Sequence, residues 1–349
     1  MLRRRQLSLL VPLALLARPA TAASTRVVTD QLDRRVTVPA TVRRVVTLQH
    51  QTLDIIVELG ATDTLVGVLR SWPSLIPGLD RIAPSLKTLP TPGDLTTANV
   101  EDLLRLQPDV VFVTNYAPAA MIRQIEQVGI PVIVISLAEG EGTDRAKLNP
   151  TFTDDDKAYA NGLVAGVRLI GTILGKSQRA DQLLDAAFAG RHLVEGRVAD
   201  IPPDQRVRLY VANPDMTTYG AGKYTGVMLT RSGGINVASE IRGTAKVSME
   251  DVLRWNPQVI FVQDRYAPVA DEIRRSAAWQ AVDAVRNGRI AITPEYVKPW
   301  GYPLPEALAL GELWMAKQLY PARFADIDMQ AKADSFYRTF YGQPYTGPN

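Results

Sequence analysis

Cysteine is absent from the 349 residues of this chain, and histidine occurs only twice. The absence of cysteine excludes disulfide bonds, thiolate metal sites, cysteine nucleophiles and a lipid anchor on cysteine. Two histidines, His50 and His192, and no cysteine are too few ligands for a typical site that binds a bare zinc or manganese ion, because such sites use several nitrogen, sulfur and carboxylate ligands. A lone histidine after a buried strand is more often a satisfied polar residue than a ligand. His50 is therefore only a minor candidate ligand, and we expect any metal to arrive inside its own chelator.

Motifs for nucleotide binding and for common hydrolytic chemistry are also missing. There is no G-x-S-x-G elbow, and the Gly-rich segment Tyr219–Tyr224 lacks the spacing of a phosphate-binding loop, since Lys223 precedes Tyr-Thr. The acidic run Asp154–Asp156 is typical of the charged first turn of a helix. These absences favour a binding protein over an enzyme, and they leave an interaction protein with a degenerate cleft as a third alternative.

The N-terminus has the pattern of an export signal. Arg3–Arg5 form a cationic start, and the apolar run Leu7–Ala17 is shorter than the ~20 residues that span a bilayer. Ala20–Ala22 form an A-x-A cleavage pattern, so we expect a signal peptide over 1–22 and a mature, soluble protein in a Gram-negative periplasm. Removal of this segment, which holds four arginines and no acid, changes the formal net charge from +3 to −1. The charge therefore gives no support for nucleic-acid binding. Export through the Sec or the twin-arginine route stays open.

An internal repeat gives the architecture. Glu101–Val113 and Glu250–Val262 are identical at eight of thirteen positions, and Tyr116–Pro118 matches Tyr266–Pro268 shortly afterwards. Each copy predicts a short helix, a turn with proline and a buried strand of β-branched and aromatic residues.

Similar strands alternate with helices in both halves, which predicts the α/β class. The chain is long enough for two medium domains. We expect two Rossmann-like lobes with parallel sheets, divided as 23–150, 151–199 for a bridging helix and 200–349. The expected strands are Val45–Leu48, Leu65–Val68, Val110–Val113, Val132–Ile135, Val207–Val211, Val259–Val262 and Arg289–Ile292, with helices near Thr52–Leu59, Ala119–Gln127 and Tyr224–Ser232.

The segment between the lobes predicts a stiff helix instead of a flexible linker. From Asp154 to about Ala199 it lacks proline, and apolar residues recur at helical spacing. A break is expected near Gly175–Ser177. Because ~20 helical residues span ~30 Å, such a helix predicts a preformed cleft with limited hinge motion.

The chain resembles the periplasmic binding proteins for siderophores, haem and vitamin B12, in which one long helix bridges two lobes. The resemblance covers nearly the whole mature chain and implies a monomer that delivers its ligand to an inner-membrane ABC permease dimer. It does not name the ligand. The segments that carry it are Val27–Asp30, Val36–Pro39, Leu59–Gly60, Val66–Val68, Asn99–Leu104, Pro108–Asp109, Gly129–Pro131, Gly233–Asn236, Val247–Glu250, Trp255–Pro257, Ala284–Gly288 and Leu319–Pro321.

Candidate ligand contacts follow from a rule of α/β sheets, in which ligands bind at the carboxyl ends of strands. The side chains there are aromatic and cationic, which suits an anionic, oxygen-rich chelate. A ferric siderophore carrying its own Fe³⁺ fits best, with no further cofactor; cobalamin, haem and nickel or cobalt chelates are alternatives, and an enzyme is a distant one. The candidates are Arg70, Trp72, Tyr116, Tyr219, Lys223, Tyr224, Arg265, Trp300 and Tyr302.

Two glutamates are expected to dock the permease. Glu101 and Glu250 occupy equivalent places in the two repeats. In the family that the chain resembles, a glutamate at this place in each lobe meets arginines on two symmetric permease subunits. The alternative is a purely local role in the first helical turn, with capping to Thr97 or Ser248.

Overall fold

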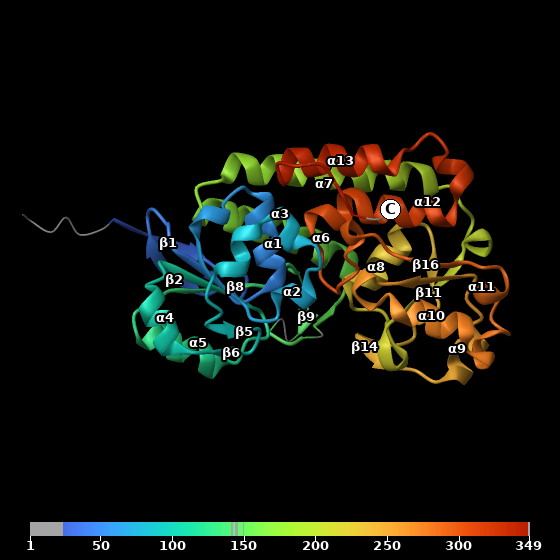
Figure 1. Ribbon diagram of the computed structural model, residues 1–349, viewed down its shortest axis with the longest axis horizontal. Coiled ribbons are helices and arrows are strands. Elements are labelled where there is room, and N and C mark those ends of the chain that lie inside the picture. Colours follow the sequence, from blue (N-terminus) through green and yellow to red (C-terminus); the bar gives the residue numbers. More distant parts are fainter. Residues whose placement is uncertain (1–23, 141, 144–145, 149, 348–349) are drawn as a thin grey trace, which may run out of the picture.

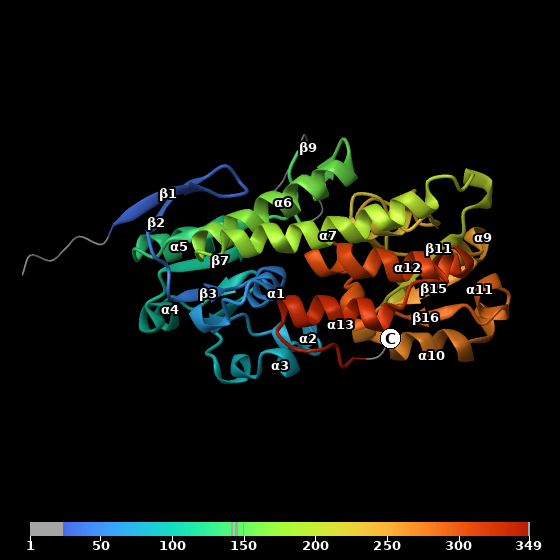
Figure 2. The ribbon, with the colours of Figure 1, turned by 90° about the horizontal axis from the view of Figure 1, so that it is seen from above.

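The computed structural model describes residues 24–140, 142–143, 146–148 and 150–347. The expected signal peptide, 1–22, lies outside these residues. Two lobes lie side by side, and long helices run along one edge of the molecule past both of them (Figures 1 and 2). None of the helices in the described ranges combines the length and apolar character that crossing a bilayer requires.

The N-terminal lobe is built on a parallel sheet with strand order β4-β3-β7-β8. β7 and β8 are buried along their whole length, as expected for β-branched strands covered on both faces. Its elements are β1 (Thr25–Thr29), β2 (Arg35–Pro39), β3 (Val45–Thr47), α1 (His50–Glu58), β4 (Leu65–Val68), α2 (Trp72–Leu75), α3 (Leu79–Ile82), β5 (Gly93–Asp94), β6 (Thr97–Ala98), α4 (Val100–Leu106), β7 (Val110–Thr114), α5 (Ala119–Gln127) and β8 (Val132–Ile135).

The C-terminal lobe repeats this topology with the parallel order β13-β11-β15-β16. Gln107 caps the C-terminus of α4, and Asn256 caps the matching helix of the second repeat. Both residues have a left-handed backbone conformation, so the repeat extends to the backbone. The predicted α/β class and parallel sheets are confirmed. The elements are β11 (Arg208–Ala212), β12 (Thr217–Tyr219), α8 (Tyr224–Arg231), β13 (Ile235–Asn236), β14 (Thr244–Lys246), α9 (Met249–Trp255), β15 (Val259–Val262), α10 (Pro268–Arg275), α11 (Asp283–Arg286) and β16 (Ile290–Ile292).

The bridge is a pair of antiparallel helices, α6 (Asp155–Ile173) and α7 (Ser177–Val198), which follow the short hairpin β9 (Gly142–Thr143) and β10 (Thr151–Phe152). The break is confirmed at Gly175, whose φ is +67°, but the chain reverses there. Arg168 Nε lies 2.9 Å from Asp181 Oδ1, which places the two helices side by side. The expected long bridging helix is present as α7, whereas the sequence did not indicate the reversal at the break, since a left-handed glycine ends a helix without fixing the direction of the next. The helix α7 has 22 residues and is about 33 Å long, so it reaches past both lobes by itself (Figure 2).

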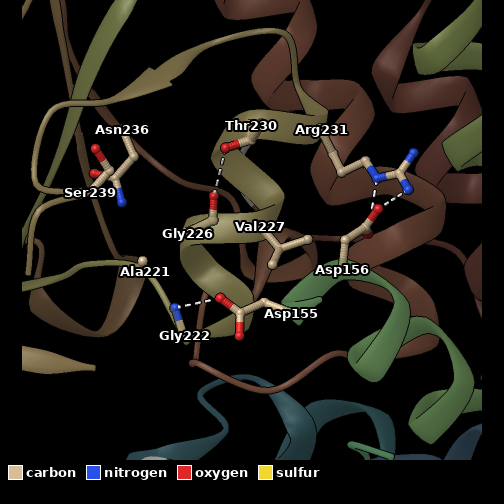
Figure 3. A pocket seen from close by; sticks show the side chains of 10 residues that line it. All are labelled: Asp155, Asp156, Ala221, Gly222, Gly226, Val227, Thr230, Arg231, Asn236 and Ser239. Carbon is tan, nitrogen blue, oxygen red and sulfur yellow. Dashed lines mark hydrogen bonds and ion pairs between the residues drawn. The ribbon is translucent and has the colours of Figure 1, made fainter. Parts of the chain in front are cut away.

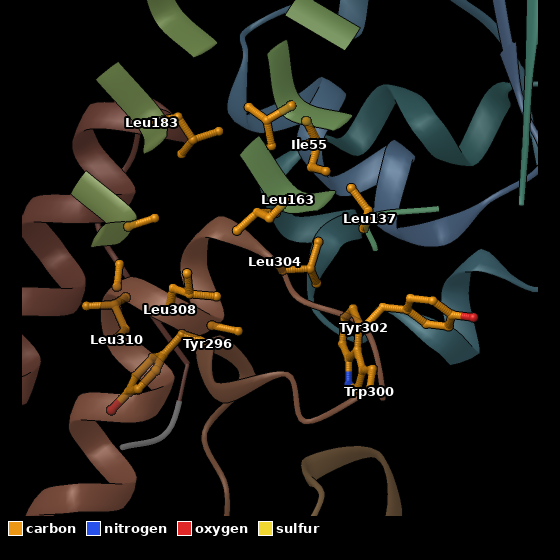
Figure 4. Packing of buried hydrophobic residues seen from close by; sticks show 14 of the residues in the cluster. Ile55, Leu137, Leu163, Leu183, Tyr296, Trp300, Tyr302, Leu304, Leu308 and Leu310 are labelled. Atoms are coloured by element: carbon orange, nitrogen blue, oxygen red, sulfur yellow. The ribbon is translucent and has the colours of Figure 1, made fainter. Parts of the chain in front are cut away.

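One hydrophobic cluster extends through both lobes. It joins Phe112 of the first sheet and Phe261 of the second through α6, α7 and the C-terminal elements. Figure 4 shows this continuity from Ile55 through Leu163 to Leu308. Close approach depends on glycine at Gly162, where an added Cβ would lie 2.2 Å from the Ala138 backbone. A shared core opposes large rotations of one lobe against the other. The C-terminal elements are a π-helix (Ala307–Gly311), α12 (Glu312–Leu319) and α13 (Met329–Phe340).

Candidate functional site

A segment of the C-terminal lobe, residues 298–304, reaches across to the N-terminal lobe; we call it the strap. Lys298 and Gly301 have φ of +42° and +84°, so the strap makes two sharp turns. The Trp300 ring lies 5.7 Å from the ring of His50, the first residue of α1. The Tyr302 hydroxyl donates to the carbonyl of Leu148 at 3.1 Å. Trp300 and Tyr302 lie together at one end of the shared core, both nearly buried (Figure 4).

Two cations flank the strap. Lys223 Nζ lies 4.8 Å from the centre of the Tyr302 ring and donates to the Leu148 carbonyl. The Arg265 guanidinium lies 5.5 Å from the Trp300 ring, and its Nε donates to Gln263 at 2.9 Å. Burial lowers the pKa of Lys223 to about 8, so its amine is mainly charged at neutral pH. Neither cation lies within ion-pair distance of a carboxylate in the described parts of the chain, although the buried carboxyl group of the neighbouring Asp264 interacts electrostatically with Arg265.

Hydrogen-bonding groups at the site also lack partners. Among the described residues, the Trp300 indole nitrogen and His50 Nδ1 are buried and have no hydrogen-bond partner. Such an unsatisfied group costs about 1–3 kcal/mol. Burial, and then the charge of Arg265, lower the pKa of His50 to about 3, which keeps the imidazole neutral. The arrangement suits a ligand that brings negative charge and acceptor oxygens. We refer to His50, Lys223, Arg265, Trp300 and Tyr302 as the interlobe site.

Further predicted residues lie beside this site. Gln263 lies at the end of β15 and donates to Asn213 at 2.5 Å, with the Tyr219 hydroxyl 3.4 Å away. Burial raises the pKa of Tyr302, a hydrogen bond with Asn115 opposes this, and the Tyr116 hydroxyl adds to the rise. The structure thus brings together six of the nine predicted contacts, which are Tyr116, Tyr219, Lys223, Arg265, Trp300 and Tyr302.

The other three side chains make no hydrogen bond, ion pair or ring contact with the strap. Tyr224, the first residue of α8, is fully buried, and its hydroxyl donates to Glu312 at 2.9 Å. Trp72 is buried in the shared core, and Arg70 is exposed beyond β4.

Two polar residues of the site, Asn213 and Gln263, were not predicted. A sequence signal existed, because Gln263 directly follows Val262 and Asn213 follows Ala212, the last residues of β15 and β11. The strand-end rule finds Gln263 as the first residue after the expected strand Val259–Val262, and Asn213 as the second residue after the expected strand Val207–Val211.

A buried lysine–carboxylate cluster lies next to the interlobe site and joins the lobes. We define it as Asp54, Glu58, Lys298, Glu306 and Tyr341. The Lys298 amine contacts Asp54 of α1 and Glu306 beyond the strap, and the Tyr341 hydroxyl lies 3.0 Å from Asp54. Three carboxyl groups thus share one lysine. Burial, and then the charge of Asp54, raise the pKa of Glu58, while burial raises the pKa of Glu306 to about 6. No sequence pattern indicated this cluster, because its members are far apart in the chain.

We expect Glu58→Gln to change how stability depends on pH. The folded wild type holds the Glu58 proton more tightly than the unfolded chain does, so its stability falls as pH rises from 4.5 toward the raised pKa. The variant lacks this loss, which is about 1.4 kcal/mol per pH unit within that window. Urea unfolding at pH 5 and pH 8 measures this difference. The free energy of unfolding of the variant, relative to that of the wild type, should be higher at pH 8 than at pH 5. Glu126→Gln, at an exposed position, is the control; parallel pH curves for all three proteins would contradict the prediction.

Apart from the interlobe site, a cavity of about 440 Å³ lies between the start of α6, the Gly-rich loop and α8 (Figure 3). Its charged groups are largely paired with one another. Asp156 pairs with Arg231, and one carboxylate oxygen of Asp155 accepts from the Gly222 amide at 2.9 Å. This cavity therefore offers less free charge than the interlobe site.

Glu101 and Glu250 lie exposed in the first turns of α4 and α9. The helix caps are Asn99 and Ser248, and their side chains accept from the amides of Asp102 and Asp251. Thr97 is therefore not the cap, and neither glutamate takes part in capping. In the described chain, neither glutamate forms a hydrogen bond or an ion pair.

Comparisons with known proteins agree with this architecture. Residues 45–297 match the family model described as periplasmic binding protein. The molybdate-binding protein MolA of Haemophilus influenzae is 50% identical over 344 residues, covering 98% of each chain. The solved structure of MolA bound to molybdate gives a TM-score of 0.90 at 51% identity, covering 93% of this chain and 100% of that one. A periplasmic solute-binding protein of Veillonella parvula gives 0.76 at 24% identity, covering 93% and 94%.

Proposed function

Because the chain belongs to the periplasmic binding protein family and serves an ABC importer as its substrate-binding component, we propose that its ligand is molybdate or a closely similar tetrahedral oxyanion. The protein holds this dianion at the interlobe site and delivers it to the permease. Half of its residues are shared with a molybdate-binding protein over nearly the full length of both chains.

The observation that carries the proposal is a pair of neighbouring cations that form no ion pair in the described structure. Lys223 and Arg265 approach the strap from the C-terminal lobe, and no carboxylate pairs with either within the described ranges. A dianion would balance both charges and would accept a hydrogen bond from the Trp300 indole. Charge-assisted hydrogen bonds in a nearly dry site are stronger than neutral ones, so a small anion can be held without a large contact area.

The ferric siderophore expected from the sequence is less well supported. That expectation treated the aromatic side chains as open faces for a large chelate. Trp300 instead contacts His50, Tyr302 contacts Lys223, and all four are nearly buried. The aromatic rings therefore cover the cations and exclude water, which suits a small anion.

Calorimetric titration of the mature protein with molybdate, tungstate, sulfate, ferric enterobactin and cyanocobalamin tests the proposal. We expect saturable 1:1 binding of molybdate and tungstate, with each competing against the other. Binding of ferric enterobactin or cyanocobalamin without any binding of an oxyanion would overturn it.

We also propose that Glu101 and Glu250 dock the protein onto the permease. Both are exposed, equivalent in the repeats and free of local partners in the described structure. The double variant Glu101→Ala, Glu250→Ala should keep the wild-type affinity for molybdate and lose stimulation of the importer's ATPase. Charge reversal to lysine should be worse, because like charges at an interface repel. Full ATPase stimulation by the double alanine variant would refute this role; Glu126→Ala serves as the control.

A further inference from the structure

A buried carboxyl group lies beside the interlobe site, and the binding described so far does not use it. Asp264 begins the short turn that follows β15, between Gln263 and Arg265. Both of its carboxyl oxygens are buried, and neither accepts a well-formed hydrogen bond from the described residues. An ionised carboxylate is costly to bury without such partners. Local structure therefore does not account for an aspartate at this position.

The neighbouring strand end carries a second buried polar group without a partner. Thr293 is the first residue after β16, and its amide donates to the carbonyl of Val262 at 2.8 Å, which places the ends of β15 and β16 side by side. The Thr293 hydroxyl is buried and has no hydrogen-bond partner in the described structure. Ligands of α/β sheets bind at such carboxyl ends. The position of Asp264 therefore favours contact with a ligand over a purely structural role.

Charged groups from three segments act on Asp264. Arg265 lies in its own turn, Glu295 in the segment after β16, and Lys298 in the strap. Burial raises the pKa of Asp264; the amide and the charge of Arg265 oppose this rise, Glu295 adds to it, and Lys298 opposes it. Glu295 and Lys298 each form an ion pair with the N-terminal lobe. Groups from the boundary between the lobes therefore influence the proton on this carboxyl group.

The charges of the site balance a dianion only when Asp264 carries a proton. With Asp264 ionised, this carboxylate and the cations Lys223 and Arg265 sum to a single positive charge. A bound dianion would then leave one negative charge in a nearly dry site, where an uncompensated charge is costly. With Asp264 protonated, the two cations match the dianion. The neutral carboxyl group can also donate a hydrogen bond to an oxygen of the anion.

We propose that the interlobe site binds its oxyanion together with one proton, which Asp264 takes from the solvent on binding and returns on release. This role rests on the proposed oxyanion ligand and adds a residue that controls its affinity. The bound anion favours the neutral carboxyl group and so raises the pKa of Asp264 further. Affinity should therefore rise as pH falls through the window between the pKa values of the free and the bound protein.

Calorimetric titration with micromolar molybdate at pH 5.5 and pH 7 tests the proposal. Wild-type affinity should be about tenfold higher at pH 5.5, and buffers of different ionisation enthalpy should reveal uptake of up to about one proton per anion. Asp264→Asn keeps a neutral donor at every pH, so it should bind at pH 7 about as tightly as the wild type does at pH 5.5, without proton uptake. Loss of a merely structural residue would not raise the affinity. Asp264→Ser, which also removes the charge, replaces this variant if it does not fold.

Other titrating groups need controls of their own. Lys223, whose pKa burial lowers to about 8, stays mainly charged between the two pH values, and His50, whose pKa burial lowers to about 3, stays neutral. Burial raises the pKa of Glu58, and that of Glu306 to about 6, so both belong to the same range. Glu58→Gln and Glu306→Gln should nevertheless keep the wild-type pH dependence of affinity, because neither belongs to the interlobe site.

The outcomes separate this inference from the proposed ligand. Equal wild-type affinities at the two pH values would overturn the role of Asp264 and leave molybdate as the ligand. The same pH dependence in Asp264→Asn as in the wild type would do so too. Absence of molybdate and tungstate binding at either pH would refute the proposed function, and the proton-linked binding with it.

Discussion

Lys298→Met should reduce the free energy of unfolding by about 3–5 kcal/mol, because it leaves buried carboxylates without a counter-ion. Lys298 is the cation of the lysine–carboxylate cluster, where it contacts Asp54 and Glu306. Burial alone would lower the pKa of Lys298, but the charges of Asp54 and then Glu306 outweigh it and raise the pKa. The amine is therefore charged throughout the physiological range.

Urea denaturation at pH 5 and pH 8 measures this effect and its origin. Without the lysine, which lowers the pKa of Glu306, this carboxyl group should hold its proton more tightly in the folded state, so the loss of stability should be larger at pH 8 than at pH 5. Lys87→Met is the matched control, since Lys87 is 58% exposed and pairs with Asp80 at the surface. It should cost less than about 1 kcal/mol. Wild-type stability of Lys298→Met at both pH values would show that the cluster does not hold the lobes together.

Arg265→Gln and Lys223→Gln should each weaken molybdate binding by about 10- to 150-fold, or roughly 1.5–3 kcal/mol. Each change removes a cation that forms no ion pair in the described structure and that a bound dianion would pair with. Glutamine keeps some hydrogen-bonding capacity, so the loss reports mainly on charge. Titration calorimetry at constant ionic strength measures it, and added salt should weaken wild-type binding in the same direction.

A charge-matched control distinguishes direct pairing of the anion with these two side chains from the effect of the protein's overall charge on anion binding. Arg338→Gln removes one exposed positive charge on α13, away from the strap. It should leave the affinity within about twofold of the wild type. Equal losses in Arg265→Gln, Lys223→Gln and Arg338→Gln would mean that the anion does not bind between the lobes.

The sequence determined the repeated unit of the fold. Buried runs such as Val132–Ile135 predict strands because β-branched residues pack on both faces of a parallel sheet, and the structure has β8 at the same residues. The helix Ala119–Gln127 was likewise predicted with its observed bounds. Such local patterns depend on neighbours within a few residues. Their repetition along the chain was sufficient to predict two lobes with the same topology.

The sequence also located much of the candidate site, since the strand-end rule needs only the order of the strands. Among its candidates are Lys223, Arg265, Trp300 and Tyr302, which the structure places near one another. It also suggested Tyr224, because a pattern of residue types does not show which side of a helix start faces the ligand. Lys223 is the extended N-cap residue of α8 and Tyr224 is its first helical residue; Lys223 reaches the strap, while Tyr224 reaches Glu312 in the core.

Only the tertiary structure decided the contacts between distant segments. The reversal at Gly175 depends on how α7 packs against α6, and a left-handed glycine permits many directions. His50 and Trp300 are 250 residues apart, and Lys298 and Asp54 are 244 apart. No local pattern selects such pairs, because each joins segments that only the packing of the two lobes around a shared core brings together. The sequence therefore specified the lobes and their repeated surface, whereas the packing between the lobes decided which charges are left for a ligand.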